Sequence, residues 1–291
     1  MNLPDALQFY SEGASQFLGQ ILHLSYRSSW WMLIGISLLV WALEILRPWR
    51  KDQLPFRKDF GLDAFYMFFN YFLAPWLFLN FIYLFGQELL GRHLSALPSF
   101  NLSRVPSWSQ ILIIFFVQDF CHYWIHRLLH RFPFLWKYHK VHHSVEEMGF
   151  AAHLRYHWME NVIYRSLGSI PFFLLGFSPL DLFWVHLFTL LIGHLNHANL
   201  EWNYGPLKWI LNHPTMHLWH HAEKIPQGRQ YGVNYGISLS LWDLIFKTGI
   251  WAHPPSDLKL GFKDRNKFPD SFLGQNLSPL GPSSLSEAPR V

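Results

Sequence analysis

The chain has 291 residues, enough for one large or two ordinary domains, and 51% of them are hydrophobic, 19% aromatic and 14% charged. Soluble domains usually carry roughly 25% charged residues, so this composition favours an integral membrane protein. The net charge of +4 is modest, and no basic block is interleaved with aromatic residues, so we expect no nucleic-acid partner. The single cysteine, Cys121, excludes an internal disulfide and a multi-cysteine metal site.

The first part of the chain is predicted to hold membrane-crossing helices. Residues 1–29 form an N-terminal segment that lacks the basic start and apolar core of a signal peptide. The apolar run 30–46, at about 1.5 Å per helical residue, is just long enough to cross the hydrocarbon of a bilayer. The basic cluster 47–51 follows it and predicts a cytoplasmic end. The run 61–85 is expected to cross back, so residues 30–108 would form the transmembrane helices and their connections.

A histidine-rich catalytic domain is predicted over residues 109–250. Its first apolar run, 111–125, returns to the basic side and leads into the histidines. The run 167–195 is split by Gly176-Phe-Ser-Pro179. We expect it to form a hairpin of two short helices that enters the membrane without crossing it, because the histidines at its end must rejoin the others. Residues 251–291 form a polar tail, which is expected to be disordered from about residue 269.

These segments together predict the fold class. We expect an all-α integral membrane protein with about three crossings. Its architecture would be a small transmembrane helical bundle with a cytosolic, histidine-rich, di-metal helical cap. The histidines would then lie on the same side of the membrane as the basic cluster.

Fifteen of the 18 histidines lie between residues 122 and 221. Positions i, i+3 and i+4 of a helix share one face, so histidines at these spacings direct their imidazoles the same way. Neutral imidazole offers a nitrogen lone pair and is the commonest metal ligand among side chains. Eight imidazoles exceed the needs of one tetrahedral ion, so two adjacent metal ions are predicted. The three boxes are His126-x3-His130, His139-x2-His142-His143 and His217-x2-His220-His221.

Other residues near the boxes are candidates for the same site. Asp119 lies about one helical turn before the first histidine of this region, and we expect its carboxylate to accept an imidazole N–H; a partnership with Arg127 or a tyrosine is the alternative. Glu160 lies one turn after His157, and both acids are assigned catalytic roles. The remaining predicted metal ligands are His157 and His197. Further candidates, as ligands or as residues that support ligands, are His122, His153, His194 and His213, the last of which is also placed to cap a following helix.

Around these boxes the chain resembles the fatty acid hydroxylase / sterol desaturase superfamily of membrane di-iron enzymes. The resemblance extends over residues 119–248 and includes the three boxes in order. Lys247 departs from the family pattern, which often has glycine there, and the spacing His194-x2-His197 differs from the i, i+4 box of some members. Further matching motifs are Tyr123-Trp124-x-His126-Arg127, Leu154-Arg155-Tyr156-His157, His197-Ala198-Asn199 and Leu241-Trp242-Asp243.

The resemblance implies two iron ions as the cofactor and O2 as a co-substrate, with zinc as a substitute that the same ligands accept. Ligand type alone also allows copper or nickel, and iron is favoured because inert C–H bonds need a redox-active oxidant. We expect hydroxylation or desaturation at a C–H position of a membrane lipid, with fatty acyl, sphingoid and sterol-like substrates all open. No fused cytochrome b5-like domain is seen, so a separate electron donor of the cytochrome b5, ferredoxin or reductase type is expected.

Two other functions remain open at this stage. One is a zinc-dependent membrane hydrolase, against which stand the number of imidazoles and the absence of a His-Glu-x2-His motif. The other is a non-catalytic metal-binding membrane protein, against which stand the complete boxes. Metal content would separate all three functions. A bacterial inner membrane is the expected location, or the endoplasmic reticulum if the chain is eukaryotic.

Overall fold

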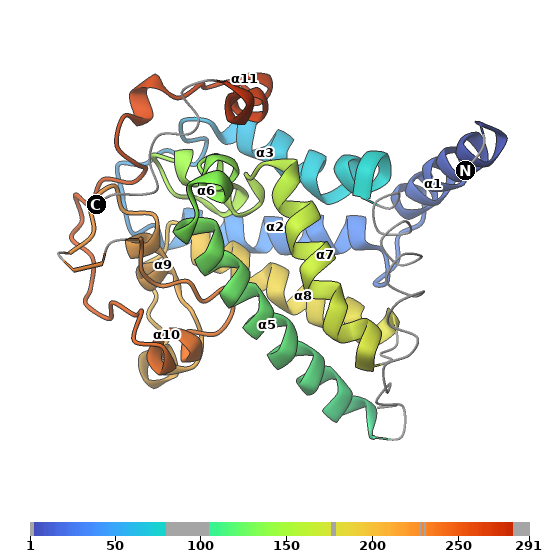
Figure 1. Ribbon diagram of the computed structural model, residues 1–291. Helices are drawn as coiled ribbons and strands as arrows, with labels where there is room; N and C mark the ends of the chain where they lie inside the picture. Colours follow the sequence, from blue (N-terminus) through green and yellow to red (C-terminus); the bar gives the residue numbers. More distant parts are fainter. Residues whose placement is uncertain (1–2, 80–104, 176–178, 227, 230, 282–291) are drawn as a thin grey trace.

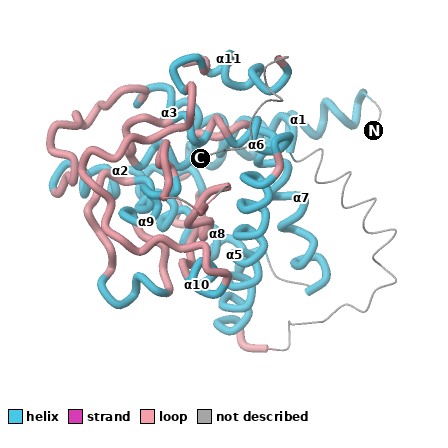
Figure 2. The backbone as a smooth tube through the Cα atoms, turned by 60° about the vertical axis from the view of Figure 1, so that its left-hand side comes forward, coloured by secondary structure: helices cyan, strands magenta, loops and turns pink. Residues whose placement is uncertain are grey.

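The computed structural model describes residues 3–79, 105–175, 179–226, 228–229 and 231–281. Every regular element in this part of the chain is helical, and only two isolated β-bridges join loops. The all-α prediction is therefore confirmed for the described residues. The long helices extend from one end of the molecule, while short helices and loops gather at the other end, around α9 (Figures 1 and 2).

The N-terminal part begins with helices α1 (Leu3–Leu22) and α2 (Ser29–Leu46). Ser28 caps α2, because its side chain accepts the backbone N–H of Trp31 at 3.4 Å. The helix predicted over 30–46 is thus confirmed. By length and composition, α2 is also the single helix of the described residues that could cross a membrane. The structure therefore supports one candidate span, where the sequence predicted about three crossings.

The next helix changes its hydrogen-bonding pattern along its length. Helix α3 (Phe60–Phe68) continues into π-helical turns at Phe69–Leu73 and Pro75–Leu79. Proline has no N–H to donate, so a regular α-helical ladder cannot run through residue 75. The first π-turn places Asn70 where its amide donates to the carbonyls of Leu154 (2.9 Å) and Tyr156 (2.7 Å). The rest of the predicted run 61–85 lies outside the described residues.

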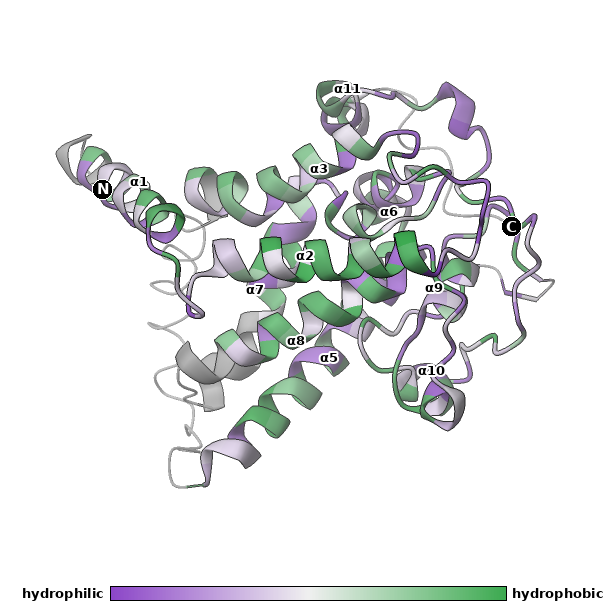
Figure 3. Ribbon diagram, turned by 180° about the vertical axis from the view of Figure 1, so that it is seen from behind, coloured by the Kyte–Doolittle hydropathy of each residue, from purple (hydrophilic) through white to green (hydrophobic). Residues whose placement is uncertain are grey.

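Three long helices build the centre of the molecule: α5 (Ser107–Arg131), α7 (Trp158–Leu175) and α8 (Pro179–His197). Helix α5 packs against both α7 and α8, and α8 also packs against α2. Figure 3 shows that hydrophobic residues run along α2, α3, α5 and α8, whereas hydrophilic residues gather in the loops at the other end. The two helices expected over 167–195 are present, with residues 176–178 between them outside the described residues. Entry of this pair into a membrane stays a prediction.

Short helices form the end that holds the histidines. Helix α6 (Pro133–His139) and helix α9 (Pro214–His220) each begin with proline, whose missing N–H costs nothing in a first turn. After α6 the chain forms a 3₁₀ turn at His142–Ser144, so the second box does not lie on one continuous helix. Helix α10 (Leu241–Ile245) closes this end. The helix predicted after residue 213 is confirmed.

Residues 269–281 of the tail are more ordered than their composition predicted. Helix α11 (Phe272–Leu277) lies within the segment expected to be disordered from about residue 269. The Phe272 ring packs against the rings of Phe65, Tyr66 and Phe69, with ring centroids 4.8–4.9 Å apart. For residues 269–281 the expectation was wrong, because one aromatic anchor, combined with a serine cap at Ser271, orders a segment that is otherwise polar. Residues 282–291 lie outside the described part.

Candidate metal centre

Nine histidines converge in the interior as two groups. Within each group the candidate ligand nitrogens all lie within 4.8 Å of one another, and every member is buried. The five-histidine group comprises His126, His130, His139, His143 and His220, and the four-histidine group comprises His142, His197, His217 and His221.

The two groups adjoin because neighbouring residues of one box point to different groups. In the 3₁₀ turn, His142 joins the four-histidine group and His143 joins the five-histidine group. At the end of α9, His221 and His220 divide in the same way. Successive side chains of a helical turn diverge by roughly 100–120°, so one turn serves two sites. The groups meet where the rings of His143 and His221 stack, with centroids 4.5 Å apart.

Backbone carbonyls set the orientation of several imidazoles. Four of the nine rings lie with Nδ1 2.8–3.1 Å from a carbonyl oxygen, which can only accept a hydrogen bond. Nδ1 therefore carries the hydrogen, and the lone pair of Nε2 faces the group. The four pairs are His126 with Tyr235, His142 with Arg155, His197 with Gly193, and His220 with Val233.

The four-histidine group brings ring nitrogens unusually close together. The Nε2 atoms of His197 and His142 are 3.1 Å apart, and Nε2 of His217 lies 3.0 Å from Nε2 of both His197 and His221. Burial lowers the pKa of each of these rings below the ordinary 6.5, so they are neutral. Neighbouring imidazoles add to this effect at His197, His217 and His221, and the charge of Arg155 adds to it at His142. Neutral nitrogens that share a small buried space repel one another unless a cation lies between them. This donor set fits a metal ion.

The five-histidine group has the same character. Nε2 of His126 lies 3.2 Å from Nε2 of His139. The Nε2 atoms of His130, His143 and His220 are buried and have no hydrogen-bond partner in the described part of the chain. Leaving such atoms unpaired costs free energy, about 1–3 kcal/mol for each group. Coordination of a second ion would satisfy them.

Glu160 reaches this centre through another residue. Its Oε2 atom lies 2.8 Å from Nδ1 of His139, and both side chains are buried. Burial raises the pKa of Glu160 well above its usual range. The carboxyl group therefore positions His139, and the structure gives it no contact with the interior of either group.

His157 and His213, both candidates from the sequence, lie outside the two groups. His157 donates from Nε2 to the carbonyl of Asn276 at 3.0 Å and accepts the N–H of Met159 on Nδ1, so both ring nitrogens are engaged. His213 caps α9, where Nδ1 accepts the N–H of Met216 at 3.2 Å. Of the two roles open to His213, the structure shows the cap.

Three further candidates lie close by without joining a group. His153 and His194 contact each other through their Nδ1 atoms at 2.9 Å, and the His153 ring packs 5.2 Å from that of His197. These two rings thus form a layer behind the four-histidine group. A Cβ atom at Gly193 would lie 2.2 Å from the His153 ring, so only glycine leaves room for it. His122 lies one turn before His126 and packs against Tyr164, with ring centroids 5.1 Å apart.

Asp119 has a different role from the one expected. Its oxygens accept the backbone N–H groups of Ser238 (2.9 Å) and Leu239 (3.1 Å) and the indole N–H of Trp242 (2.9 Å). These donors occupy the buried carboxylate, and no imidazole is among its hydrogen-bond partners in the described part of the chain. Asp119 therefore anchors the loop of residues 233–240 and does not bind a histidine.

A second acid holds the same loop. Asp243 accepts the backbone N–H groups of Tyr235 (2.9 Å) and Gly236 (2.8 Å) and the hydroxyl of Thr248. The carbonyls that this loop supplies orient two histidines of the five-histidine group. The Trp-Asp motif thus has a structural explanation. The departure at Lys247 has one too, because this residue adopts φ 56°, a conformation that glycine reaches without strain.

Sequence reasoning missed an ionic network beside the four-histidine group. Arg155 is fully buried, and its Nη1 atom lies 3.0 Å from Asp63 and 3.1 Å from Asp59. Its backbone carbonyl is the acceptor for His142. Asp63 also pairs with Arg57. The signal available in the sequence was Asp63 itself, a charge inside an apolar run, which is costly unless it is paired.

The fold and the site together define a helical protein with two adjoining, buried histidine groups arranged to hold metal ions. Residues 111–248 match the fatty acid hydroxylase family. The resemblance stated from the motifs is confirmed.

The chain is also similar in sequence to several named lipid enzymes. The chain is 32% identical to ornithine lipid hydroxylase OlsE of Rhizobium tropici over 69% of its own length and 58% of that protein. It is 35% identical to the human alkylglycerol monooxygenase over 51% of its length and 32% of the relative, and 28% identical to the rice very-long-chain aldehyde decarbonylase GL1-5 over 45% and 22%. The chain thus spans less than two thirds of each of these relatives. No solved structure matches it.

Proposed function

We propose that this chain oxidises a membrane lipid with O2, inserting oxygen at a C–H bond, and that its two histidine groups hold two iron ions for this reaction. The observation that carries the proposal is the pair of adjoining, buried, all-imidazole groups. The names of the relatives favour hydroxylation over desaturation, since they describe a lipid hydroxylase and alkylglycerol monooxygenases.

The residues fit this cofactor. Neutral imidazoles suit first-row transition metals, and the unpartnered, buried Nε2 atoms of His130, His143 and His220 can each offer a lone pair to a cation. Iron held there would supply the redox chemistry that activates O2 and removes hydrogen from a C–H bond. The overall reaction consumes O2, two electrons and two protons and releases the alcohol and water. A separate electron donor of the cytochrome b5, ferredoxin or reductase type would supply the electrons.

The protein's own contribution is orientation and exclusion of water. Carbonyls of the loop 233–240, of Arg155 and of Gly193 fix the imidazole rings before any metal binds. Burial keeps these rings neutral, so each offers a lone pair without first losing a proton. It also keeps bulk water away from the reacting centre, which limits side reactions.

We further propose an integral membrane location, with the histidine groups on the cytoplasmic side. Helix α2 is the candidate span, and its exposed leucines, such as Leu38 and Leu39, present an apolar surface suited to lipid. The basic cluster 47–51 follows its end, and the carbonyl of Asn199, two residues after the ligand His197, accepts the N–H of Trp49 there at 3.0 Å. The histidine groups therefore lie at the basic end of α2. A bacterial inner membrane is the proposed location.

Metal content and oxygen incorporation test the proposal. The full chain, purified in detergent from iron-supplemented cells, is expected to hold two irons that Mössbauer spectra show to be coupled. With a reductase system and ¹⁸O2, labelled oxygen is expected in a lipid, and ornithine lipids and alkylglycerols are the first substrates to supply. Zinc alone, retained through repeated iron reconstitution and accompanied by no O2 consumption, would replace this proposal with the hydrolase alternative.

Variants connect the activity to the two groups. His142→Ala and His220→Ala each remove one ligand, from different groups, and each is expected to lower the iron content and abolish oxidation. His23→Ala is the matched control, because His23 is exposed at the end of α1. Full activity in either ligand variant would refute the site.

A further inference from the structure

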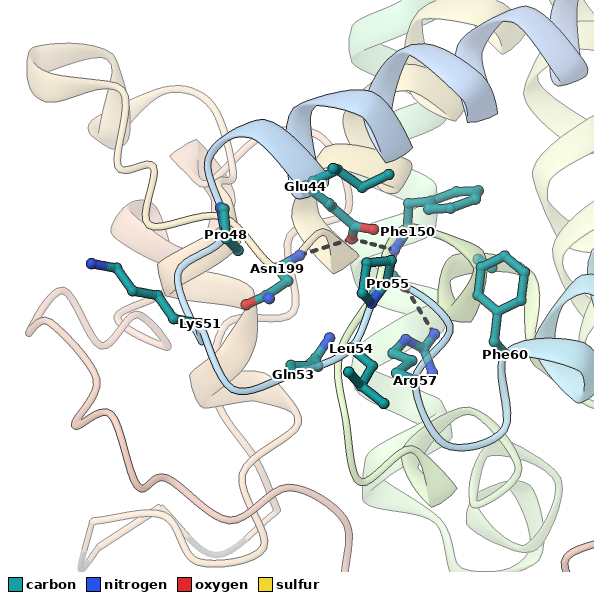
Figure 4. A pocket seen from close by; sticks show the side chains of 13 residues that line it. Glu44, Pro48, Lys51, Gln53, Leu54, Pro55, Arg57, Phe60, Phe150 and Asn199 are labelled. Carbon is teal, nitrogen blue, oxygen red and sulfur yellow. Dashed lines mark hydrogen bonds between the residues drawn. The ribbon is translucent and has the colours of Figure 1, made fainter.

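A cavity of about 210 Å³ lies at the C-terminal end of α2 and is separate from the histidine groups (Figure 4). One wall comes from residues 44–60, which precede the segment that matches the family. The other wall comes from residues 149–151 and Asn199. The cavity lies close to the metal centre, because the ring of Phe150 packs 5.6 Å from that of His194 and Asn199 follows His197 by two residues.

Glu44 is the acidic group of this cavity. Its Oε1 atom accepts two backbone N–H groups, from Phe150 at 2.8 Å and from Asn199 at 2.9 Å, which hold the carboxylate in place (Figure 4). Its Oε2 atom accepts no hydrogen bond from the described part of the chain. A carboxylate oxygen without a donor, on a side chain that lines a cavity, is an acceptor for a ligand that carries N–H groups.

The basic residues of the cavity do not occupy this acceptor. The guanidinium of Arg57 is bound to Asp63 and to the carbonyl of Gly149. Lys51 is exposed and extends away from Glu44 (Figure 4). Burial raises the pKa of the Glu44 carboxyl to about 7, so this group is partly ionised near neutral pH and a bound cation would favour its charged form. The cavity thus combines an acidic group inside with the positive charge of Lys51 at its edge. This arrangement suits a ligand that carries both charges.

Exposed apolar side chains lie beside Lys51 at the cavity. Ile45 and Leu54 line it and expose 48% and 71% of their surface, and the nearby Leu46 and Phe56 are exposed as well. Large apolar residues around a charged cavity, at the end of the candidate membrane span, are suited to the boundary between headgroups and acyl chains. The occupant that fits has a charged head and an apolar chain.

We propose that this cavity binds the headgroup of a membrane lipid that carries a primary ammonium group. The ammonium donates to Oε2 of Glu44, and the anionic part of the headgroup faces Lys51. The inference rests on the proposed function and names the headgroup class of its lipid. A quaternary ammonium has no N–H to donate, so choline lipids bind less well.

Lipid binding by the full chain in detergent tests the inference. Native mass spectrometry compares phosphatidylethanolamine, an ornithine lipid, phosphatidylcholine and phosphatidylglycerol at equal concentration. The wild type is expected to retain the two amine-bearing lipids about tenfold more than the others, equivalent to about 1.4 kcal/mol. Glu44→Gln keeps an oxygen for the two backbone N–H groups but loses the charge, and it is expected to abolish this preference. Glu12→Gln, a change at an exposed carboxylate of α1, is the control and is expected to preserve it.

A competition experiment with the wild type tests the same inference without a variant that could misfold. Glycerophosphoethanolamine is expected to displace bound phosphatidylethanolamine, whereas glycerophosphocholine is not. Equal displacement by both, or an unchanged preference in a folded Glu44→Gln protein, would overturn the inference. Retention of the ornithine lipid alone would assign the site to amino-acid headgroups. Because binding requires neither iron nor O2, loss of the lipid preference and loss of oxidation are separate results.

Discussion

Glu160 and His139 form a buried contact of 2.8 Å between Oε2 and Nδ1 that joins α7 to the end of α6. In the described part of the chain no backbone carbonyl accepts a hydrogen bond from Nδ1 of His139, so the carboxyl group of Glu160 takes the part that carbonyls play for four other histidines. The contact fixes the ring and turns Nε2 toward the five-histidine group.

Glu160→Ala should therefore weaken the five-histidine group without removing a ligand. We expect metal affinity or turnover to fall about 10–100-fold, the usual effect of losing a partner of a ligating histidine. Glu160→Gln retains an acceptor oxygen, so its metal affinity and turnover should fall less than those of Glu160→Ala. Metal analysis of both variants and turnover with saturating lipid measure the effect. Unchanged metal content and turnover in Glu160→Ala would show that His139 needs no such support.

Replacement of His157 separates ligands from their neighbours. His157→Ala is expected to keep both metal ions, because the ring nitrogens bond to the backbone of Met159 and Asn276. It should lower the free energy of unfolding by about 1–2 kcal/mol, since a buried hydrogen bond to the tail is lost. Metal analysis and thermal unfolding in detergent measure the two effects. Loss of one metal ion would make His157 a ligand after all.

Asp119→Ala is expected to destabilise the fold, and to affect the metal centre only through the loop that Asp119 anchors. Three N–H groups lose their acceptor, and the free energy of unfolding should fall by about 3 kcal/mol or more, since each buried unpaired donor costs about 1–3 kcal/mol. Metal should then be lost as the loop 233–240 loosens. Hydrogen exchange of this loop, compared with that of α2, gives a direct readout. Normal protection of the loop with loss of metal would instead indicate a direct role for Asp119 at the metals.

Gly193→Ala tests the packing behind the four-histidine group. The added Cβ atom would collide with the His153 ring at 2.2 Å, so we expect a loss of about 1–3 kcal/mol in stability. Occupancy of the four-histidine group should fall as well, because the carbonyl of Gly193 orients His197. Gly35→Ala in α2 is the control: it meets no atom within 4 Å, and alanine favours a helix. Equal behaviour of the two variants would contradict the packing argument.

Much of the metal centre could be predicted from local spacing. The boxes 126–130, 139–143 and 217–221 contain eight of the nine converging histidines, because helical periodicity depends only on neighbouring residues. The ninth, His197, came from the resemblance and from its position after an apolar run. The first apolar helix, α2, and helix α9, which begins at Pro214, could also be predicted from local sequence.

The partition of these histidines was decided only by the tertiary structure. Adjacent residues such as His142 and His143 enter different groups, because each group is completed by α5, α8 or α9 from distant parts of the sequence. The same holds for the acids: Asp119 meets a loop about 120 residues away, while Glu160 meets His139 across the bundle. The sequence by itself determined which side chains could bind metal. Long-range packing decided which of them share an ion and which support the others, because those contacts depend on how the helices and loops lie against one another.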